Sequence, residues 1–279
     1  MDPVTHRVHA WDGLPIHVLE WVSGNRLPPI LCLPGLVRTS GDFEALAPQI
    51  GSGRRIISID YAGRGNSGRT RDIERYAPEA CARDVMDVCS ALHIHDAVAI
   101  GTSFGGLLAM GIAVARPGLI RAAILNDIGP DIGAGGAEFV HGFAGTDPAL
   151  ESVDACVTYL RTTLPPLSLY TEAAWRRMAE LTYTPGADGR FHPVWDTRIA
   201  GLLNRPAQDL WPLFGALCQR PVLLIRGAVS DILLPGTVAR MQTVQPSMQV
   251  VTIPGIGHAP ILTEPPALAA IKVFLKDCT

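Results

Sequence analysis

Ser103 lies at the centre of a Gly-x-Ser-x-Gly pattern, Gly101-Thr102-Ser103-Phe104-Gly105. The apolar run 97–100 precedes this pattern, and the helix-like segment 106–113 follows it. A strand, a sharp turn and a helix with a serine at the apex form a nucleophile elbow. The glycines on both sides of the serine let the strand and the helix approach each other closely. The pattern therefore predicts that Ser103 is a nucleophile, held at a helix N-terminus where negative charge is stabilised.

A serine hydroxyl needs a general base to become an effective nucleophile, and the sequence offers His258 for that role. His258 lies in the glycine- and proline-rich loop 254–260, directly after the strand-like run 249–253. A loop of this kind can bring an imidazole over the edge of a sheet and leave it free to move a proton. We therefore predict that His258 is the base.

A carboxylate should orient the imidazole and stabilise its charged form, and two aspartates follow strand-like runs. Asp231 lies in the loop after the run 221–227, and Asp127 lies directly after the run 122–126. Both give the chain order serine, aspartate, histidine that this type of elbow requires. We favour Asp231, because its loop has the composition of an acid loop and Asp127 opens directly into another segment. Asp127 is the alternative, with a structural role if Asp231 is the acid.

Two backbone N–H groups should receive the oxyanion of a tetrahedral intermediate. One is that of Phe104, the residue after the proposed nucleophile. The other should come from the loop after the apolar run 29–33, which reads Pro34-Gly35-Leu36-Val37. Proline has no N–H, so we assign the second donor to Leu36.

Taken together, these residues resemble the α/β-hydrolase fold family over nearly the whole chain. The resemblance implies a serine hydrolase with a Ser-Asp-His triad and an inserted cap. The segment 60–67, Asp-Tyr-Ala-Gly-Arg-Gly-Asn-Ser, is similar to the aspartate and glycine turn of that family. Two positions depart from the family pattern: Pro34 replaces the usual histidine of the oxyanion loop, and Ala62 replaces a common arginine. The serine at the elbow argues against haloalkane dehalogenase or epoxide hydrolase chemistry, because those relatives carry an aspartate there.

The composition agrees with a soluble, compact enzyme, and the proposed serine chemistry needs no cofactor. The chain has 279 residues, 48% of them hydrophobic, which suffices for one large core and an inserted lobe. The net charge of −3 and the absence of a basic stripe give no indication of nucleic-acid binding, so we expect no nucleic-acid partner. Six scattered cysteines without metal-ligand spacing predict no metal site and reduced thiols. The N-terminal residues do not resemble a signal peptide, and no apolar segment is long enough for a membrane span. We expect a cytoplasmic protein with a small-molecule substrate; the oligomeric state stays open.

The chain alternates between strand-like and helix-like segments, which predicts an α/β fold with a mostly parallel sheet covered on both faces by helices. Residues 8–21 read as a hairpin, and further strands are expected near 30–33, 56–59, 97–100, 122–125, 222–225 and 249–253. Helices are expected over 78–92, after the elbow, and over 266–276. We place the hydrolase core in residues 1–130 and 216–279.

The segment 131–215 is far longer than one crossover helix needs, so we expect it to form a helical cap over the sheet edge. It begins with a glycine-rich stretch and contains helical patterns around 151–163 and 171–181. Most of its aromatic residues should be structural. We assign Phe139 and Trp175 to the wall of an apolar substrate pocket.

The expected reaction is hydrolysis of a small to medium apolar carboxylic ester or lactone through an acyl-enzyme. Hydrolysis of an amide or a carbon–carbon bond beside a carbonyl, acyl transfer, and perhydrolase or lyase chemistry are compatible with the same triad. A different class is a small-molecule receptor of the same fold, which would bind a ligand with negligible turnover.

Overall fold

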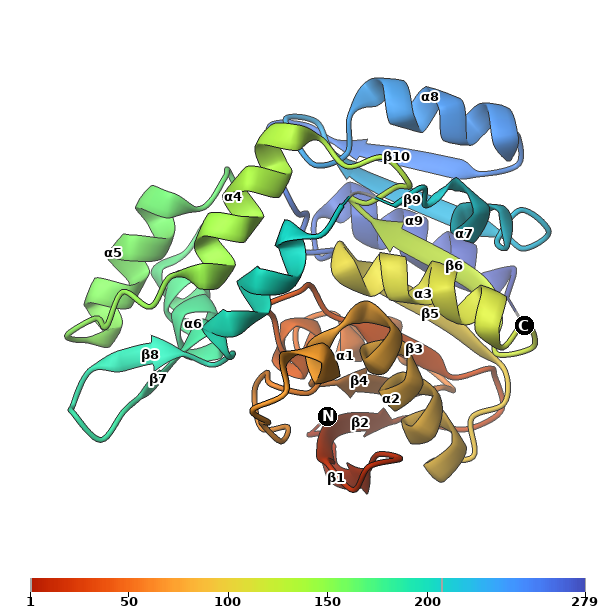
Figure 1. Ribbon diagram of the computed structural model, residues 1–279. Coiled ribbons are helices and arrows are strands. Elements are labelled where there is room, and N and C mark those ends of the chain that lie inside the picture. The colour runs from red at the N-terminus through yellow and green to blue at the C-terminus, as the bar shows by residue number, and fades with distance from the viewer. Residues whose placement is uncertain (1, 207, 279) are drawn as a thin grey trace.

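The computed structural model of the chain describes residues 2–206 and 208–278, and they form an α/β fold (Figure 1). Within these residues the central sheet has eight strands. Their spatial order is β1 (Val4–His9), β2 (Pro15–Val22), β4 (Arg55–Ile59), β3 (Ile30–Leu33), β5 (Ala97–Thr102), β6 (Ile120–Asn126), β9 (Val222–Gly227) and β10 (Gln249–Ile253). The hairpin β1–β2 and the pair β2–β4 are antiparallel, and all other neighbours are parallel. The predicted strands and the predicted fold class are confirmed.

Alternate residues of the parallel strands face two separate apolar cores. Leu31, Ala99 and Leu125 face one side of the sheet, whereas Ile30, Val98 and Ile124 face the other. The first side is covered by α2 (Pro78–Ala91), α3 (Phe104–Ala115), α7 (Trp211–Gly215) and α8 (Pro235–Val244). The second side is covered by η1 (Ser40–Phe43), α1 (Ala47–Ile50) and α9 (Pro265–Lys276). Burial on both faces explains why these strands read as continuous apolar runs in the sequence.

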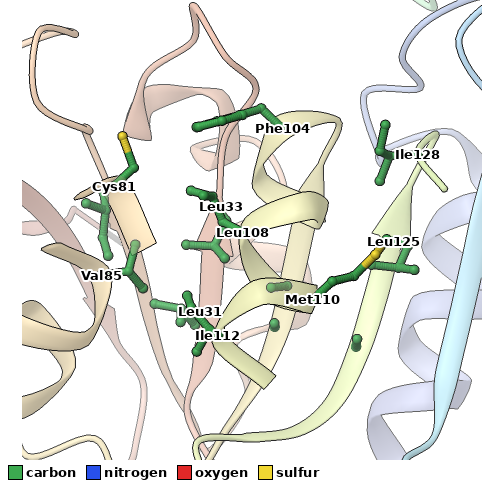
Figure 2. Close-up of a cluster of buried hydrophobic side chains, with 14 of the residues drawn as sticks. Leu31, Leu33, Cys81, Val85, Phe104, Leu108, Met110, Ile112, Leu125 and Ile128 are labelled. Atoms are coloured by element: carbon green, nitrogen blue, oxygen red, sulfur yellow. The ribbon is translucent and has the colours of Figure 1, made fainter. Parts of the chain in front are cut away.

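The helix α3 packs directly on the centre of the sheet (Figure 2). Leu108 and Ile112 of this helix lie among Leu31 and Leu33 of β3, and Val85 of α2 packs beside them. All these side chains are at most 2% exposed. Because the interior is close-packed, the N-terminal end of α3 has a fixed position at the carboxyl end of β5.

The segment between β6 and β9 contains the elements that stand beyond one end of the sheet (Figure 1). They are α4 (Ala134–Gly145), α5 (Val153–Thr163), α6 (Glu172–Thr182) and the hairpin β7 (Tyr183–Pro185) and β8 (Phe191–Pro193). The chain returns to the sheet through η3 (Thr197–Asn204). We call residues 131–215 the insertion. Its last helix, α7, packs against α3 beside the sheet and not with α4–α6.

Across residues 2–206 and 208–278, no helix combines the length and the apolar character that crossing a membrane requires.

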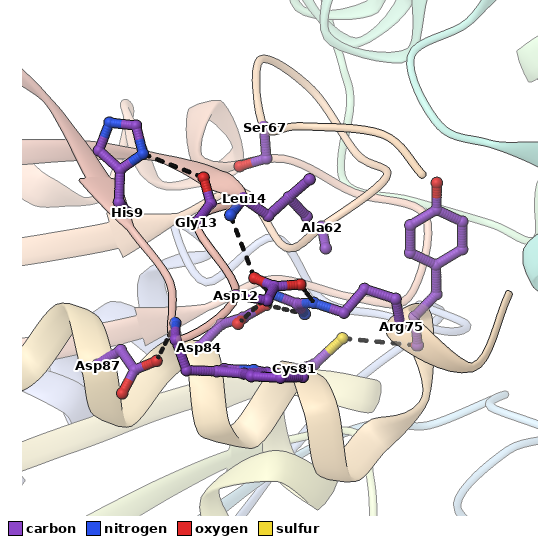
Figure 3. A network of polar contacts seen from close by, with 12 residues as sticks. His9, Asp12, Gly13, Leu14, Ala62, Ser67, Arg75, Cys81, Asp84 and Asp87 are labelled. Atoms are coloured by element: carbon purple, nitrogen blue, oxygen red, sulfur yellow. Dashed lines mark hydrogen bonds and ion pairs between the residues drawn. The ribbon is translucent and has the colours of Figure 1, made fainter. Parts of the chain in front are cut away.

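A buried ionic network joins the turn of the hairpin β1–β2 to α2 and to η2 (Ile73–Tyr76) (Figure 3). Arg75 donates two hydrogen bonds to the Asp84 carboxylate, each 2.7 Å long, and two more to Asp12. The Asp84 side chain is fully buried. Burial raises the pKa of Asp84 to about 6 although Arg75 acts in the opposite direction.

Removing the positive charge from this network should destabilise the fold. Arg75→Met is expected to lower the free energy of unfolding by about 3–5 kcal/mol, because it leaves a buried carboxylate without a partner. The loss should be smaller at pH 5 than at pH 8, since below a pKa of about 6 Asp84 binds a proton and carries no charge. Urea denaturation at both pH values measures this. Arg176→Met, which breaks an exposed ion pair with Asp154, is the control and should cost less than about 1 kcal/mol. Equal losses for the two variants would contradict the prediction.

Candidate active site

Ser103 occupies a strained turn between β5 and α3. Its φ of 51° and ψ of −119° lie outside the usual regions for a residue with a side chain. A Cβ at Gly101 would lie 2.5 Å from the Gly106 nitrogen, and a Cβ at Gly105 would collide with the Leu33 carbonyl. Only glycine fits at these two positions, which is why the pattern has glycine on both sides of the serine. The turn projects the Ser103 side chain into a cavity at the end of the sheet.

His258 connects Ser103 to a buried carboxylate. The Nε2 atom of His258 lies 2.9 Å from the Ser103 hydroxyl oxygen, and its Nδ1 atom lies 2.8 Å from Oδ2 of Asp127. The imidazole is 13% exposed, while the Asp127 carboxylate is fully buried. The three side chains come from the ends of β5 and β6 and from the loop after β10, and they form one line of hydrogen bonds.

Asp127 is held in place by its position directly after β6. Its backbone turns through a φ of 57°, and its N–H donates a 2.7 Å hydrogen bond to the carbonyl of Ile225 in the neighbouring strand β9. Its Oδ1 atom accepts the N–H of Gly227 at 2.9 Å. This contact leaves Oδ2 directed at His258.

The structure contradicts the prediction of Asp231 as the acid, because the carboxylate that lies against His258 is that of the alternative residue, Asp127. Asp231 is exposed, and its backbone carbonyl packs against Gly133 and Gly136 at the start of α4. It lies four residues after the end of β9, so its loop has turned toward the insertion before the aspartate is reached. Asp127 directly follows β6, which pairs with β5, the strand that leads to Ser103. It therefore lies near Ser103 without an intervening loop.

The two predicted oxyanion donors lie beside Ser103. Phe104 is the first residue of α3, and the N–H groups of the first helical turn have no partner within the helix. Leu36 lies in a tight turn closed by a 3.1 Å hydrogen bond from the Arg38 N–H to the Gly35 carbonyl. Gly35, Leu36 and Ser103 line the same cavity. The turn forms with Pro34 in place of the usual histidine.

Two buried side chains donate hydrogen bonds to backbone carbonyls of the turn that contains Leu36. The hydroxyl of Tyr61 donates to the carbonyl of Pro34 at 3.1 Å, and Nε of Arg64 donates to the carbonyl of Leu36 at 2.9 Å. Burial raises the pKa of Tyr61 well above its usual value, so its hydroxyl stays a neutral donor. Asp60 shapes the turn that carries Tyr61 and Arg64 by accepting the N–H groups of Ser40 and Asn66.

The cavity above Ser103 has a volume of about 730 Å³ and a mostly apolar wall. The insertion supplies one wall of this cavity, through residues of α4, of α6 and of the segment 164–171. Two ion pairs, Arg38–Asp42 and Arg177–Glu44, also border it. A cavity of this size and polarity suits an apolar organic molecule that presents one polar bond to Ser103.

Of the two pocket residues predicted in the insertion, Phe139 lines the cavity and Trp175 is not among the lining residues. Trp175 packs on the buried cluster between α5 and α6, and the Arg161 guanidinium lies 5.4 Å from its ring centre. Met178 packs on the same cluster but also lines the cavity. The other lining residues of α6 are Ala174, Arg177 and Leu181.

The segment 164–171, in which no pocket residue was predicted, contributes Leu164, Leu167 and Leu169 to the wall. The pair Pro165-Pro166, which ends α5, could have marked it as a separate segment.

Phe139 and Phe143 also border a second, shallower groove of about 430 Å³ between α4 and α5. The two rings stack with centres 6.0 Å apart, and both residues line this groove as well as the cavity above Ser103.

Within residues 2–206 and 208–278, no three histidine, cysteine, aspartate or glutamate side chains gather as metal ligands would.

Comparison with known proteins places this geometry in a family. The model of the alpha/beta hydrolase fold family matches residues 28–265. The chain is 29% identical over 266 residues to a 3-hydroxybutyrate-oligomer hydrolase from Cupriavidus necator, which covers 91% of this chain and 90% of that protein. It is 26% identical over 247 residues to a 2-(acetamidomethylene)succinate hydrolase from Mesorhizobium japonicum, which covers 88% of this chain and 85% of that protein.

A crystal structure of an alpha/beta hydrolase from Novosphingobium aromaticivorans superimposes on the chain with a TM-score of 0.91. The two sequences are 36% identical, and the match covers 99% of each chain. Since the family pattern spans most of the sequence and the structures agree from end to end, the chain belongs to the alpha/beta hydrolase fold family.

Proposed function

We propose that the protein is a serine hydrolase that cleaves small to medium apolar carboxylic esters through an acyl-enzyme. The observation that carries the proposal is the line of hydrogen bonds from Ser103 through His258 to Asp127, with the serine facing an apolar cavity. This arrangement gives a hydroxyl nucleophile, a base within reach of its proton, and a buried carboxylate that orients the base.

In the first step, Nε2 of His258 takes the proton of the Ser103 hydroxyl while the oxygen attacks the carbonyl carbon of the ester. The N–H on Nδ1 donates to Asp127, which holds this tautomer and stabilises the imidazolium. The imidazolium then gives its proton to the leaving alcohol, and the acyl group stays on Ser103. A water molecule then loses a proton to His258 and attacks the acyl carbon. The bond from that carbon to the Ser103 oxygen breaks, the imidazolium returns its proton to this oxygen, and the acid leaves.

The Phe104 and Leu36 N–H groups are the proposed donors to the oxyanion. They are backbone groups of two rigid elements, the first turn of α3 and the turn 34–38, so they need not reorganise when the charge develops.

Two of the relatives and the cavity support ester cleavage. The relative from Cupriavidus necator is named a hydrolase of 3-hydroxybutyrate oligomers. A second relative, from Mus musculus and 27% identical over 241 residues, is named a diacylglycerol lipase. The largely apolar wall suits the acyl chain of an ester, and we propose that the insertion acts as a cap that closes over it.

The first test is hydrolysis of p-nitrophenyl esters with acyl chains of graded length, together with the dimeric ester of 3-hydroxybutyrate. We expect many turnovers per protein molecule on at least one ester, and labelling of Ser103 by a fluorophosphonate. Labelling without turnover on any ester, combined with turnover on an amide or a carbon–carbon substrate, would overturn the proposed ester specificity. Ligand binding without any turnover would point to a receptor.

Phe139 should set the upper limit of acyl length, because it lines both the cavity and the neighbouring groove. Phe139→Ala is expected to raise kcat/KM for octanoyl over acetyl esters by about tenfold, since each methylene placed in apolar surroundings contributes about 1 kcal/mol. Trp175→Ala is the matched control, because it removes an aromatic ring of the insertion that does not line the cavity. An unchanged length profile for Phe139→Ala, or the same change in both variants, would contradict the role of Phe139.

A further inference from the structure

Arg64 is a fully buried arginine whose side chain contacts the loop of the proposed oxyanion donor. It is 0% exposed, and its Nε and Nη1 atoms donate to the carbonyls of Leu36 and Ala62 at 2.9 and 2.7 Å. Among the described residues no carboxylate pairs with it, and its Nη2 atom has no hydrogen-bond partner. An arginine buried without a counterion is costly for stability. The rings of Tyr61, Tyr76 and Phe104, each with its centre 5.8 Å from the guanidinium carbon, supply cation–π contacts in place of a counterion. The Nε hydrogen bond then directs this side chain at the loop that carries the proposed donor Leu36.

The three carbonyls of the loop 34–36 are all bound, and together they fix the orientation of the Leu36 N–H. The Pro34 carbonyl accepts from Tyr61, the Gly35 carbonyl accepts from the Arg38 N–H, and the Leu36 carbonyl accepts from Arg64. A trans peptide is planar, so the Leu36 N–H points opposite to the bound Gly35 carbonyl. Gly35 has the most backbone freedom in the loop, and the contacts on either side of it prevent the peptide from rotating.

We propose that Arg64 is a positioning residue that holds the Leu36 N–H in place for the oxyanion, an inference that rests on the hydrolase function proposed above. Arg64 does not line the cavity, so it acts through the loop and not by touching substrate. Its guanidinium carbon lies 5.8 Å from the ring centre of Phe104, the residue that carries the other donor. The Arg64 guanidinium therefore contacts the backbone of one donor residue and the ring of the other.

The insertion fixes the backbone that carries Arg64. The Gly65 N–H donates to the Val194 carbonyl, and the Asp196 N–H donates to the Gly63 carbonyl, each at 2.8 Å. Trp195 lies between these two contacts, and its backbone pairs with that of Arg64 in an isolated antiparallel β-bridge. Its ring packs on Phe143 of the cavity wall, with ring centres 5.6 Å apart. The position of the arginine thus depends on docking of the insertion against the turn 60–67.

The test compares Arg64→Met and Arg64→Lys with Arg54→Met. Arg54 is the matched control, because it is also buried and donates to the carbonyls of Pro28 and Leu275, away from Ser103. We expect Arg64→Met to lower kcat on p-nitrophenyl butyrate by about 10–100-fold, less than the loss of a whole oxyanion donor. Labelling of Ser103 by a fluorophosphonate should slow by a similar factor. Arg64→Lys keeps the charge and should lie between Arg64→Met and the wild type.

Inhibitor affinities separate positioning from a structural effect. A trifluoromethyl ketone forms an oxyanion on Ser103, so Arg64→Met should weaken its binding by the same factor as kcat. The matching methyl ketone, which binds as a ground-state ligand, should bind within about threefold of its affinity for the wild type. The inference fails if both ketones weaken equally, or if Arg64→Met and Arg54→Met slow labelling by the same factor.

Failure of the proposed function gives a different result. A wild-type protein that is labelled by the fluorophosphonate but cleaves no ester would overturn the ester specificity, while the labelling rates of the Arg64 variants would still decide the role of Arg64. A wild-type protein that is not labelled would overturn both.

Discussion

Ser103→Ala is expected to lower ester turnover by about 10⁵-fold or more, because it removes the atom that attacks the substrate. The residual rate should come from the oxyanion donors and from substrate binding alone. A first-order burst of p-nitrophenol, which signals acyl-enzyme formation, should disappear in the variant. Steady-state and burst kinetics with p-nitrophenyl esters measure both effects.

The control for this substitution is Thr102→Ser, which changes the preceding residue of the elbow and keeps the nucleophile. Thr102 lines the cavity, and its hydroxyl accepts a 3.0 Å hydrogen bond from Asn126, which serine can retain. We expect this variant to stay within about tenfold of the wild type. Retained turnover in Ser103→Ala, with a normal circular dichroism spectrum, would show that another group attacks the ester.

Asp127→Asn should lower kcat by about 10⁴-fold, which is the loss expected when the orienting carboxylate is replaced by an amide. Gly227 N–H donates to Oδ1 of Asp127, so the asparagine should keep its oxygen at that position and present its NH₂ group to His258. An NH₂ group facing Nδ1 favours the imidazole tautomer with its proton on Nε2. That tautomer cannot accept the proton of Ser103.

Asp231→Asn is the matched control for the acid, since it makes the same chemical change in the exposed aspartate of the neighbouring loop. We expect its kcat to stay within about twofold of the wild type. A large loss in Asp231→Asn together with near-full activity in Asp127→Asn would return the acid to Asp231. Thermal unfolding of both proteins separates loss of catalysis from loss of fold.

The sheet and the elbow could be predicted from the sequence because their signals are local. Apolar runs such as 97–100 and 222–225 are continuous because both faces of the sheet are covered. The glycines at 101 and 105 are required by contacts within the elbow and with Leu33. The signal for α2 is also local. This helix begins and ends within one residue of the predicted segment 78–92, because apolar residues recur along one face at helical spacing.

The choice of acid could not be settled in this way, because it depends on a relation between distant segments. Asp127 and Asp231 both follow strands and both satisfy the chain order, so no pattern within either segment separates them. What separates them is the sheet order, in which β6 lies between β5 and β9, and the side on which the loop after β9 leaves the sheet. Asp127, which directly follows its strand, is the aspartate that lies against His258.

The cavity wall was the least predictable part for a related reason. Trp175 and Met178 lie on the same short helix and both pack on the cluster between α5 and α6, but only Met178 also lines the cavity. An aromatic residue in a helix satisfies a core and a pocket equally well. Which of the two it meets is decided by tertiary packing, which the sequence of the helix alone does not show.

The position of Asp127 has a consequence for how enzymes on this scaffold can diversify. Ser103 and Asp127 both precede the insertion, and His258 follows its return to the sheet. The three proposed catalytic residues are therefore encoded outside the insertion, which supplies much of the cavity wall. A recombinant exchange of residues 131–205 between homologues could give the same reaction centre a new substrate range in one genetic event. Such a chimera would have to keep the backbone hydrogen bonds that join Val194 and Asp196 to the turn 60–67.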